Sequence, residues 1–398
     1  MPTVKLKILM IAFELPPYNS GGLGEAVLAL TKSLAKMGIE ITLLLPKKLP
    51  HKYDHIKIIY ADEFEPKKQI DEKEFKKQKE INFKEFKVYT KELGTDLLKN
   101  GFNELSNLMV KRALKEEFDI IHGHDWMTVK ACMELKKLTG KKMILQIHAT
   151  EYDRSPKQHI DPFKYTVEKL GMDASDAVVA VSKYTKHIIN KYYQIPNEKI
   201  FVVYNAPTIE CPNTNFKLKI EDNIILFVGR ITYQKGMHQF LETCKKVIDA
   251  IPNTLVVVMG NGDMYNEVVQ KSCEMGMAGH IVFTGFLRGE QRDIVFNSAS
   301  VFLMPSVSEP FGLVAAEAAQ FGVPVVVSKQ SGVSEVLEYC VKADFWDTEL
   351  MSKQIIKILK SKKHKNNLSK GLEKDLKNLT WDNSATECNK VYQFVYEQ

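Results

Sequence analysis

Two positively charged side chains stand on one loop, directly after an apolar run that is typical of a buried strand. In the segment IILFVGRITYQKG, Arg230 ends the run and Lys235 follows it at the start of the next predicted helix. An arginine fork and a lysine point charge together suit a diphosphate. Ligands of open α/β sheets bind at the carboxyl ends of the strands, so this position favours anion binding over the alternative of two ordinary surface bases.

Two carboxylates lie in the segment SVSEPFGLVAAE, which follows another apolar run, VFLMP. The pattern predicts that Glu309 lies in a loop, that Gly312 permits a turn, and that residues 313–320 form a helix. Glu317 would then lie about one turn into the helix. One carboxylate can meet a sugar hydroxyl while the other takes a ribose diol, and the backbone N–H groups of Gly312 and Leu313 can hold a phosphate. A helix-surface glutamate is the alternative for Glu317.

A third motif is the loop PPYNSGGLGE, between the first predicted strand and the first predicted helix. Gly21 and Gly22 let the backbone approach a ligand closely, and a helix beginning near Leu23 offers free N–H groups. The loop therefore suits a phosphate, although its spacing differs from the dinucleotide fingerprint GxGxxG. A structural turn is the alternative interpretation.

The elements that must position these motifs alternate along the chain. Short apolar runs are separated by segments of helical periodicity, which is typical of parallel sheet covered on both faces. The candidate strands span residues 6–13, 40–45, 56–60, 118–122, 142–147, 177–181, 200–204, 224–228, 254–259, 281–284, 301–304 and 324–327. Right-handed crossovers between such strands give an α/β fold with doubly wound sheets.

A break near residues 205–222 divides this pattern. The stretch is polar, contains prolines and shows little periodicity, so we interpret it as an interdomain linker. The residues after it repeat the opening order of strand, glycine-containing loop and helix. Two similar halves predict a crevice between them to which both offer loops. Residues 381–396 have the pattern of an amphipathic helix that docks on another surface.

Composition excludes several classes of protein. The 398 residues are 44% hydrophobic and 26% charged, which supplies a core and excludes a disordered chain. The net charge of +6 is too small to indicate a dedicated nucleic-acid binder. No apolar run approaches the roughly 18 residues of a membrane span, and the N-terminus has the pattern of a strand rather than a signal peptide. The scattered cysteines argue against disulfides and a zinc site. Residues 65–100, rich in Lys and Glu, predict an exposed helical insertion or lid.

Together these motifs resemble the retaining nucleotide-sugar glycosyltransferases of the GT-B fold, over nearly the whole chain. The resemblance rests on the E-x7-E element with SEPFGL, the Arg–Lys pair in GRITYQKG and the loop GGLGEA. Within that class the chain is similar to the family 4 hexosyltransferases and to the glycogen and starch synthases of family 5. Residues 122–126, HGHDW, and residues 148–154, HATEYDR, add to the likeness to the synthases. At Asn19 the glycine loop has an asparagine where the synthases have a lysine.

The resemblance implies a division of the chain. Residues 1–205 would form a Rossmann-like acceptor domain and residues 206–378 a Rossmann-like domain for the nucleotide-sugar donor. Residues 379–398 would form a terminal helix that returns to the first domain.

The resemblance also implies roles for single residues. The catalytic residues would be Glu309, Arg230, Lys235 and His148. The donor-binding residues would be Gly21, Gly22, Gly312, Leu313 and Glu317. Asp125 would bind the acceptor, with the N-cap of a helix over residues 127–137 as the alternative. A metal site is the alternative for His122 and His124, with no third ligand in view.

The implied activity is transfer of a hexose, and for a glycogen synthase-like enzyme of glucose, from ADP- or UDP-glucose to a glycan in the cytoplasm. No metal and no cofactor beyond the donor substrate are expected, because cations and helix N-termini would stabilise the leaving diphosphate. The expected partners are the nucleotide sugar and the glycan, without nucleic acid or an integral membrane segment. Two alternatives stay open: a family 4 hexosyltransferase for another polysaccharide or a lipid-linked acceptor, and a non-catalytic nucleotide-sugar-binding protein.

Overall fold

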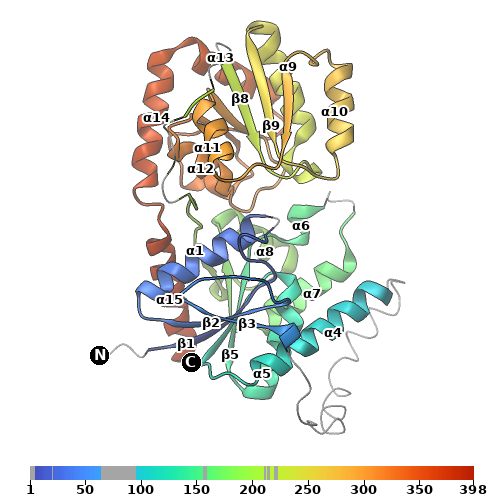
Figure 1. The fold of residues 1–398 in the computed structure, drawn as a ribbon, viewed down its shortest axis with the longest axis vertical. Coiled ribbons are helices and arrows are strands. Elements are labelled where there is room, and N and C mark those ends of the chain that lie inside the picture. The colour runs from blue at the N-terminus through green and yellow to red at the C-terminus, as the bar shows by residue number, and fades with distance from the viewer. Residues whose placement is uncertain are drawn as a thin grey trace.

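Each half of the described chain forms a parallel sheet with helices on both faces (Figure 1). The computed structural model describes residues 5–19, 21–63, 96–155, 159–209, 212, 216–218 and 223–398, without the side chains of residues 63 and 96–100. We call the seven-stranded sheet with its helices the N-lobe, and the six-stranded sheet with its helices the C-lobe. The predicted insertion over residues 65–100 lies outside the described residues, except for the backbone of its last residues.

The N-lobe sheet has the strand order β3-β2-β1-β4-β5-β6-β7, and its neighbouring strands are parallel. The strands are β1 Lys7–Ile11, β2 Glu40–Leu45, β3 Lys57–Tyr60, β4 Ile120–His124, β5 Lys142–Ile147, β6 Ala177–Ala180 and β7 Ile200–Val202. The chain enters the sheet at β1, builds one edge, and returns to β4 on the other side of β1. The strand order therefore changes direction between β1 and β4. At such a topological switch point, the loops of open α/β sheets form the ligand-binding crevice.

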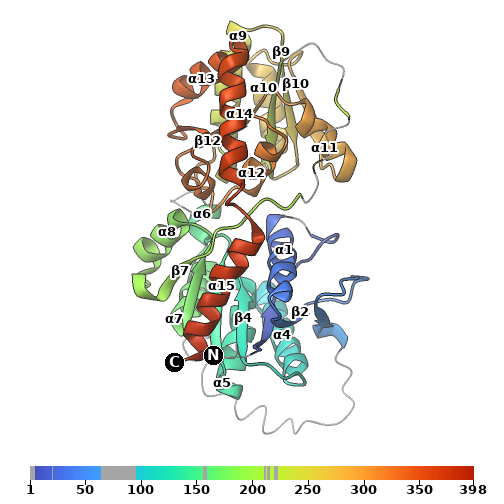
Figure 2. The same ribbon diagram turned by 90° about the vertical axis from the view of Figure 1, so that its left-hand side faces the viewer.

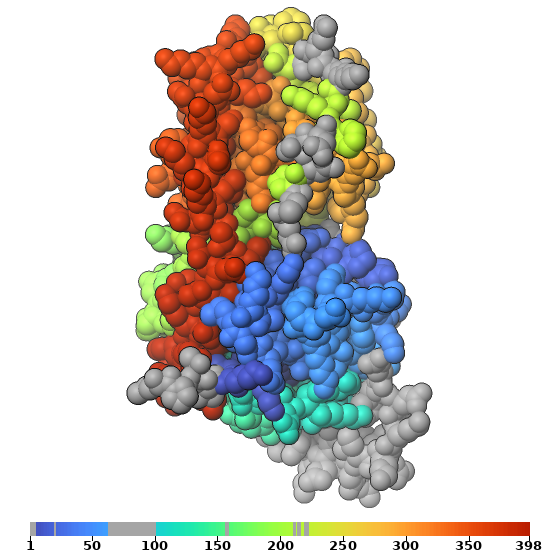
Figure 3. Space-filling model, turned by 60° about the vertical axis from the view of Figure 1, so that its left-hand side comes forward, coloured from blue at the N-terminus to red at the C-terminus, as the bar shows by residue number. Residues whose placement is uncertain are grey.

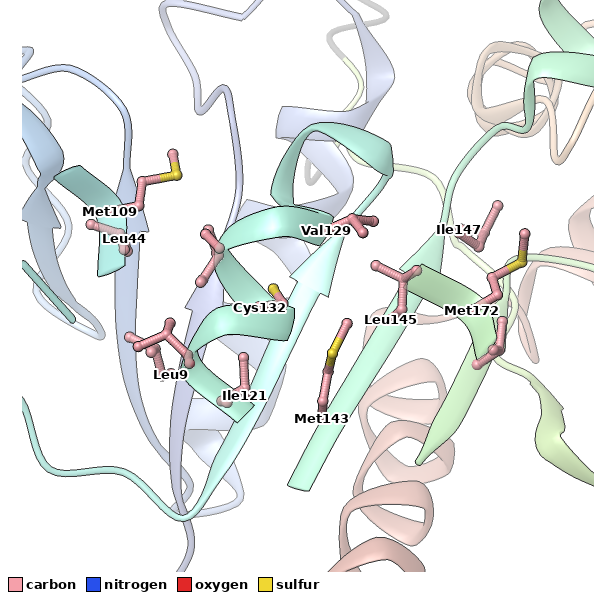
Figure 4. Close-up of a cluster of buried hydrophobic side chains, with 14 of the residues drawn as sticks. Leu9, Leu44, Met109, Ile121, Val129, Cys132, Met143, Leu145, Ile147 and Met172 are labelled. Atoms are coloured by element: carbon pink, nitrogen blue, oxygen red, sulfur yellow. The ribbon is translucent and has the colours of Figure 1, made fainter. Parts of the chain in front are cut away.

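Helices cover both faces of this sheet because its strands bury side chains on both sides. The helical segments are α1 Gly22–Lys36, η1 Ala61–Glu63, α4 Asp96–Ala113, η2 Trp126–Thr128, α5 Val129–Thr139, α6 Glu151–Arg154, α7 Pro162–Ala174, α8 Lys183–Tyr193, η3 Asn197–Lys199 and α15 Trp381–Tyr396. On one face Leu9, Ile121 and Met143 pack beneath α4, α5 and α7 (Figure 4). On the other face Ile8 and Met10 pack against α1 and α15.

The C-lobe sheet has the order β10-β9-β8-β11-β12-β13 and is also parallel. Its strands are β8 Asn223–Val228, β9 Thr254–Met259, β10 Ile281–Gly285, β11 Val301–Met304, β12 Val325–Ser328 and β13 Val341–Ala343. Its helical segments are η4 Tyr233–Lys235, α9 Met237–Ala250, α10 Tyr265–Glu274, α11 Gly289–Ser298, α12 Leu313–Gln320, η5 Gly332–Glu335, α13 Thr348–Lys360 and α14 Lys362–Leu376. The core under α9, α10 and α13 is separate from the core under α11, α12 and α14.

The predicted fold class, α/β with two doubly wound parallel sheets, is confirmed. Each candidate strand of the sequence analysis coincides with an observed strand, within a few residues at its ends. Strand β13 was not among the predicted strands, because its three residues VKA are too short for a pattern and carry a central lysine. The domain boundaries after residues 205 and 378 stay predictions.

The chain passes between the lobes twice, and the two crossings lie side by side. The first follows β7 and the second joins α14 to α15 (Figures 1 and 2). Trp381 Nε1 donates to Pro207 O at 3.1 Å, and Ser384 Oγ donates to Tyr204 O at 2.6 Å. In Figure 3 the red C-terminal helices run along one side of both lobes. The predicted hinge, residues 204–207, lies at this point.

The lobes also meet at the N-terminus of α8. Ser182 Oγ, in the N-lobe, donates to Pro310 O at 2.6 Å. The carboxylate of Glu335 in η5 accepts from Lys183 N at 2.9 Å and from Tyr184 N at 2.6 Å. The first N–H groups of a helix lack partners within it, and its dipole favours a negative charge there. The C-lobe thus caps a helix of the N-lobe.

Glu335→Gln should lower the free energy of unfolding by about 1–3 kcal/mol, because hydrogen bonds to a charged acceptor are replaced by weaker bonds to an amide. The matched control is Glu338→Gln, which removes the same charge from an exposed side chain nearby. Denaturant unfolding followed by circular dichroism measures both. Equal losses in the two variants would show that capping between the lobes contributes no stability.

Candidate functional site

The catalytic pair predicted in the C-lobe is an ion pair in the structure. Lys235 Nζ, at the end of η4, contacts Glu309 Oε2, and the two side chains are only 14% and 9% exposed. Ser306 Oγ lies 3.4 Å from the same carboxylate oxygen. A backbone hydrogen bond of 2.9 Å from Val307 N to Gln234 O holds the two loops together. A cation and a carboxylate therefore lie together at the carboxyl edge of the sheet. A charged ligand that binds there can replace either partner of the ion pair.

Arg230 lies on the same edge but is exposed, and no hydrogen bond or ion pair joins it to the described residues. Its loop is fixed through the backbone, because Ile231 N donates to Asn261 O at 3.0 Å and Gly229 N donates to Met259 O at 3.0 Å. The guanidinium is therefore free to turn toward a ligand. The segment after β9 that holds this loop, residues 260–262, was not singled out by the sequence analysis, although its two glycines at a strand end were a signal.

The two glycine motifs bring helix N-termini of both lobes together. Gly312 precedes α12 with φ at 103°, a conformation that favours glycine. A Cβ placed on Gly22, at the start of α1, would lie 3.1 Å from Leu313 Cδ1 at the start of α12. Gly21, the N-cap residue of α1, has no side chain to satisfy that terminus. The predicted donor-binding residues thus meet across the lobe boundary, and both helices direct N–H groups to this place.

Glu317, the second carboxylate, is buried in α12. Its Oε1 accepts a hydrogen bond from Thr208 Oγ1, just after the predicted hinge. Burial raises the pKa of Glu317, while the hydrogen bond from Thr208 and the positive charge of Arg292 act in the opposite direction. Glu25 of α1 also acts on this pKa, which places the first turns of α1 close to Glu317. Thr208 hydrogen-bonds to this carboxylate through its hydroxyl and its backbone, and the two oxygens together still have capacity to accept hydrogen bonds from a diol.

Asp125 positions the loop that carries His148. Its Oδ1 accepts from His148 N at 2.6 Å and from Ala149 N at 3.4 Å, and its Oδ2 accepts from Arg154 at 3.2 Å. The side chain makes no capping bond to η2, because its two oxygens accept from the His148 loop and from Arg154 instead. The N-cap alternative is therefore wrong. Contact of Asp125 with an acceptor stays a prediction.

A buried network supports this loop, and the sequence analysis missed it. Arg154 donates to Glu168 Oε1 at 2.8 Å and to Ala149 O at 2.6 Å. Tyr193 donates its hydroxyl to Glu168 Oε2. Burial raises the pKa of Glu168 to about 7, against the opposing effects of Arg154 and Tyr193. The arginine in HATEYDR was the available signal, but its partner lies on α7 and could not be found from local spacing.

The His148 loop also reaches the loop of Glu309. Ser308 Oγ of the C-lobe donates to Asp153 Oδ1 of α6 at 2.5 Å. Ser308 Oγ also lies 3.0 Å from Tyr184 Oη. Glu14, just before the glycine loop, acts on the pKa of His148. The predicted site residues of the N-lobe therefore lie beside those of the C-lobe.

A cation reaches the glycine loop from the C-lobe. Arg288 donates to Pro17 O at 2.7 Å and to Asn19 O at 2.9 Å. The Asn19 side chain donates to Gly21 O at 2.9 Å and to Glu25 Oε1 at 3.1 Å, so it stabilises the loop rather than offering a charge. An arginine of the opposite lobe thus lies against the position where the synthases have a lysine.

Neither a metal-binding cluster nor a helix able to span a membrane occurs among the described residues. Among them no cluster of three or more His, Cys, Asp or Glu side chains could hold a metal ion, and His122 and His124 belong to no such cluster. No helix in the described part of the chain is both long and apolar enough to cross a membrane.

Two family models match the chain, one on each half. The model described as starch synthase catalytic domain matches residues 7–200. The model described as glycosyl transferases group 1 matches residues 212–375. Between them the two models cover every strand of both sheets except most of β7.

Similar proteins agree with these matches. An uncharacterised glycosyltransferase of Methanocaldococcus jannaschii is 28% identical over 98% of this chain and 99% of its own. A glycogen synthase of Mycobacterium tuberculosis is 25% identical over 83% of this chain and 80% of its own.

Solved structures show the same fold. Sucrose-phosphate synthase of Thermosynechococcus elongatus superposes with a TM-score of 0.75 at 18% identity, covering 98% of this chain and 99% of its own. The catalytic domain of starch synthase IV from Arabidopsis thaliana gives 0.70 at 14% identity, covering 99% of this chain and 100% of its own. The fold is GT-B, and the two family models and these relatives identify the chain as a glycosyltransferase that resembles the glycogen synthases.

Proposed function

We propose that the chain is a retaining glucosyltransferase of the cytoplasm, which moves glucose from ADP- or UDP-glucose to a glucan. One observation carries the proposal: the Lys235–Glu309 ion pair lies on the same edge of the C-lobe sheet as the N-terminus of α12, which faces the N-terminus of α1. Positive groups suit a diphosphate and the carboxylate suits the hydroxyls of a sugar. The glycogen synthase relative and a starch synthase structure bound to ADP and acarbose support this choice of substrates.

In the proposed reaction, negative charge develops on the β-phosphate as the bond between the sugar and the phosphate breaks. Lys235, Arg230 and the two helix N-termini would stabilise that charge. Donor binding would draw Lys235 toward the phosphate and leave Glu309 to accept from the sugar. The acceptor hydroxyl would attack from the face that the phosphate leaves, which retains the configuration, and the departing phosphate would take its proton.

We propose no resident metal or cofactor for this reaction. Side chains of the C-lobe supply the positive charge that a divalent cation would otherwise bring to a diphosphate. Glu317 would bind the ribose, since it is fixed in α12 beside the N-terminus of α1. His148 would meet the donor sugar from the N-lobe.

A family 4 hexosyltransferase acting on another glycan or a lipid-linked acceptor is the second candidate. It is favoured by one observation, that both oxygens of Asp125 accept hydrogen bonds from the protein itself. A carboxylate engaged in this way has less capacity to select a glucan.

A panel of nucleotide sugars, incubated with the protein with and without glycogen, tests the proposed function. Release of ADP or UDP from the glucose donors, accelerated by glycogen, is the expected result. Release that depends on another sugar or another acceptor would favour the second candidate. Binding of a nucleotide sugar without release under any condition would contradict transfer and leave only the binding-protein alternative.

Lys235→Ala should lower kcat by about 10²–10³, the scale for losing one group that stabilises the transition state. It should also lower the melting temperature, because Glu309 is then left buried without its cation. Turnover is therefore measured well below that temperature. Lys271→Ala, on the exposed surface of α10, is the control and should change neither quantity. Wild-type turnover in Lys235→Ala would remove this lysine from the mechanism.

Asp125→Asn should lower the free energy of unfolding by about 1–3 kcal/mol, since the amide nitrogen would direct a donor toward Arg154, itself a donor. Asp173→Asn, at an exposed position on α7, is the matched control and should change it little. Denaturant unfolding compares the two. An unfolding curve like that of the wild type would contradict the positioning role.

A further inference from the structure

Three polar side chains interrupt the apolar face of the N-lobe sheet that lies under α1 and α15. His122 and His124 are two positions apart on β4 and therefore lie on the same face of the sheet. Gln146 lies beside His124 on the neighbouring strand β5. The exposed fractions of these side chains are 0%, 1% and 1%. His148 follows on the same face, just beyond the end of β5. A column of polar groups thus runs from inside the core toward the site.

The polar column is connected from α15 to the site. Tyr392 Oη, on α15, lies 2.8 Å from His122 Nδ1. The rings of His122 and His124 stack with their centroids 4.5 Å apart. His124 Nδ1 then lies 2.9 Å from His148 Nε2, and this hydrogen bond joins a fully buried ring to one that is only partly buried.

Each of these rings is neutral near pH 7. Burial lowers the pKa of His122 to about 3, lowers that of His124 well below its usual value, and lowers that of His148. A neutral imidazole carries one N–H, so in the bond between His124 and His148 one nitrogen donates and the other accepts. The direction of that bond decides which nitrogen of His148 carries the proton.

The environment of His124 decides this direction. Its Nε2 is buried and has no hydrogen-bond partner among the described residues. A buried N–H without an acceptor pays its full desolvation cost, and orphaned buried N–H groups are rarer in proteins than acceptors that lack a donor. The proton of His124 therefore belongs on Nδ1, from which it is donated to His148 Nε2.

We infer that His124 is a positioning residue that holds His148 in its Nδ1–H tautomer, so that His148 offers a hydrogen-bond donor, rather than a lone pair, to an oxygen of the bound ligand. Nδ1 of His148 has no partner among the described residues and is not a buried unpartnered atom, so a ligand can reach it. That the ligand oxygen belongs to a sugar or a phosphate rests on the proposed function. The tautomer itself does not.

The same bond opposes protonation of His148. A protonated His148 would carry a second N–H, on its Nε2, and this N–H would face the N–H of His124. To remove that clash of two donors, His124 would have to move its own proton from Nδ1 to its unpartnered Nε2. Asp125 and Glu14 favour the charged ring, while Arg154 and burial disfavour it. The pair thus keeps His148 as a neutral donor beside the anionic groups of the site.

Long-range ¹H–¹⁵N spectra of the full chain labelled with ¹⁵N-histidine report each tautomer directly, and His148→Gln assigns the signals of His148. The wild type should show Nδ1 protonated and Nε2 bare. His124→Leu should release His148 toward the Nε2–H tautomer. His124→Asn should restore Nδ1–H, because an asparagine amide nitrogen takes the place of the histidine Nδ1. Tyr392→Phe, at the far end of the polar column, should leave the tautomer unchanged.

Activity gives the second readout. His124→Leu should lower kcat by about 10- to 100-fold, the scale for losing a partner that fixes a histidine tautomer, and His124→Asn should recover most of it. Protonation of Nε2 in wild-type His148 would overturn the inference, and this result requires no variant beyond His148→Gln, which assigns the signals. An Nδ1–H tautomer that persists in His124→Leu would overturn the role of His124. A protein with the expected spectra but no transferase activity would contradict the proposed function and leave this inference standing.

Discussion

Two helix N-termini from different lobes face each other in this molecule, and the rest of the site is arranged around that constraint. The positive ends of α1 and α12 repel each other unless negative charge lies near them. The protein supplies some of that charge itself, because Glu14 Oε1 lies 3.4 Å from Gly24 N in the first turn of α1. The absence of a side chain at Gly22 lets Leu313 approach. A diphosphate would supply the remaining charge, which explains how binding and lobe contact can be coupled.

The contacts between the lobes preserve this geometry without closing the site permanently. Many of them involve backbone atoms or short side chains at the edges of the sheets, including Ser182 with Pro310 and Arg288 with Asn19. α15 belongs to the C-terminal sequence but packs in the core of the N-lobe, through Cys388, Val391 and Val395. The lobes are therefore joined firmly at one side, where the chain crosses twice, and by smaller polar contacts elsewhere. We therefore expect the molecule to open at the site by bending at the crossings.

Sequence patterns predicted the sheets well, because buried parallel strands leave apolar runs that do not depend on distant partners. They also indicated Lys235 and Glu309, since charged residues directly after such runs lie at the ligand edge. They did not predict that these two residues pair, or that Asp125 holds the His148 loop, because a backbone φ of 58° is set by the fold. The bond between His122 and Tyr392 joins residues 270 positions apart, which no local pattern reports.

A crystal structure of the protein with ADP or UDP, each with glucose, tests the central claim most directly. The account predicts the diphosphate between the two lobes, with the β-phosphate within hydrogen-bond distance of the backbone at the start of α12 and of Lys235 Nζ. Lys235 should then have left Glu309, whose carboxylate should contact the sugar. A nucleotide bound elsewhere, or bound here with the Lys235–Glu309 ion pair intact and remote from the phosphates, would contradict the account.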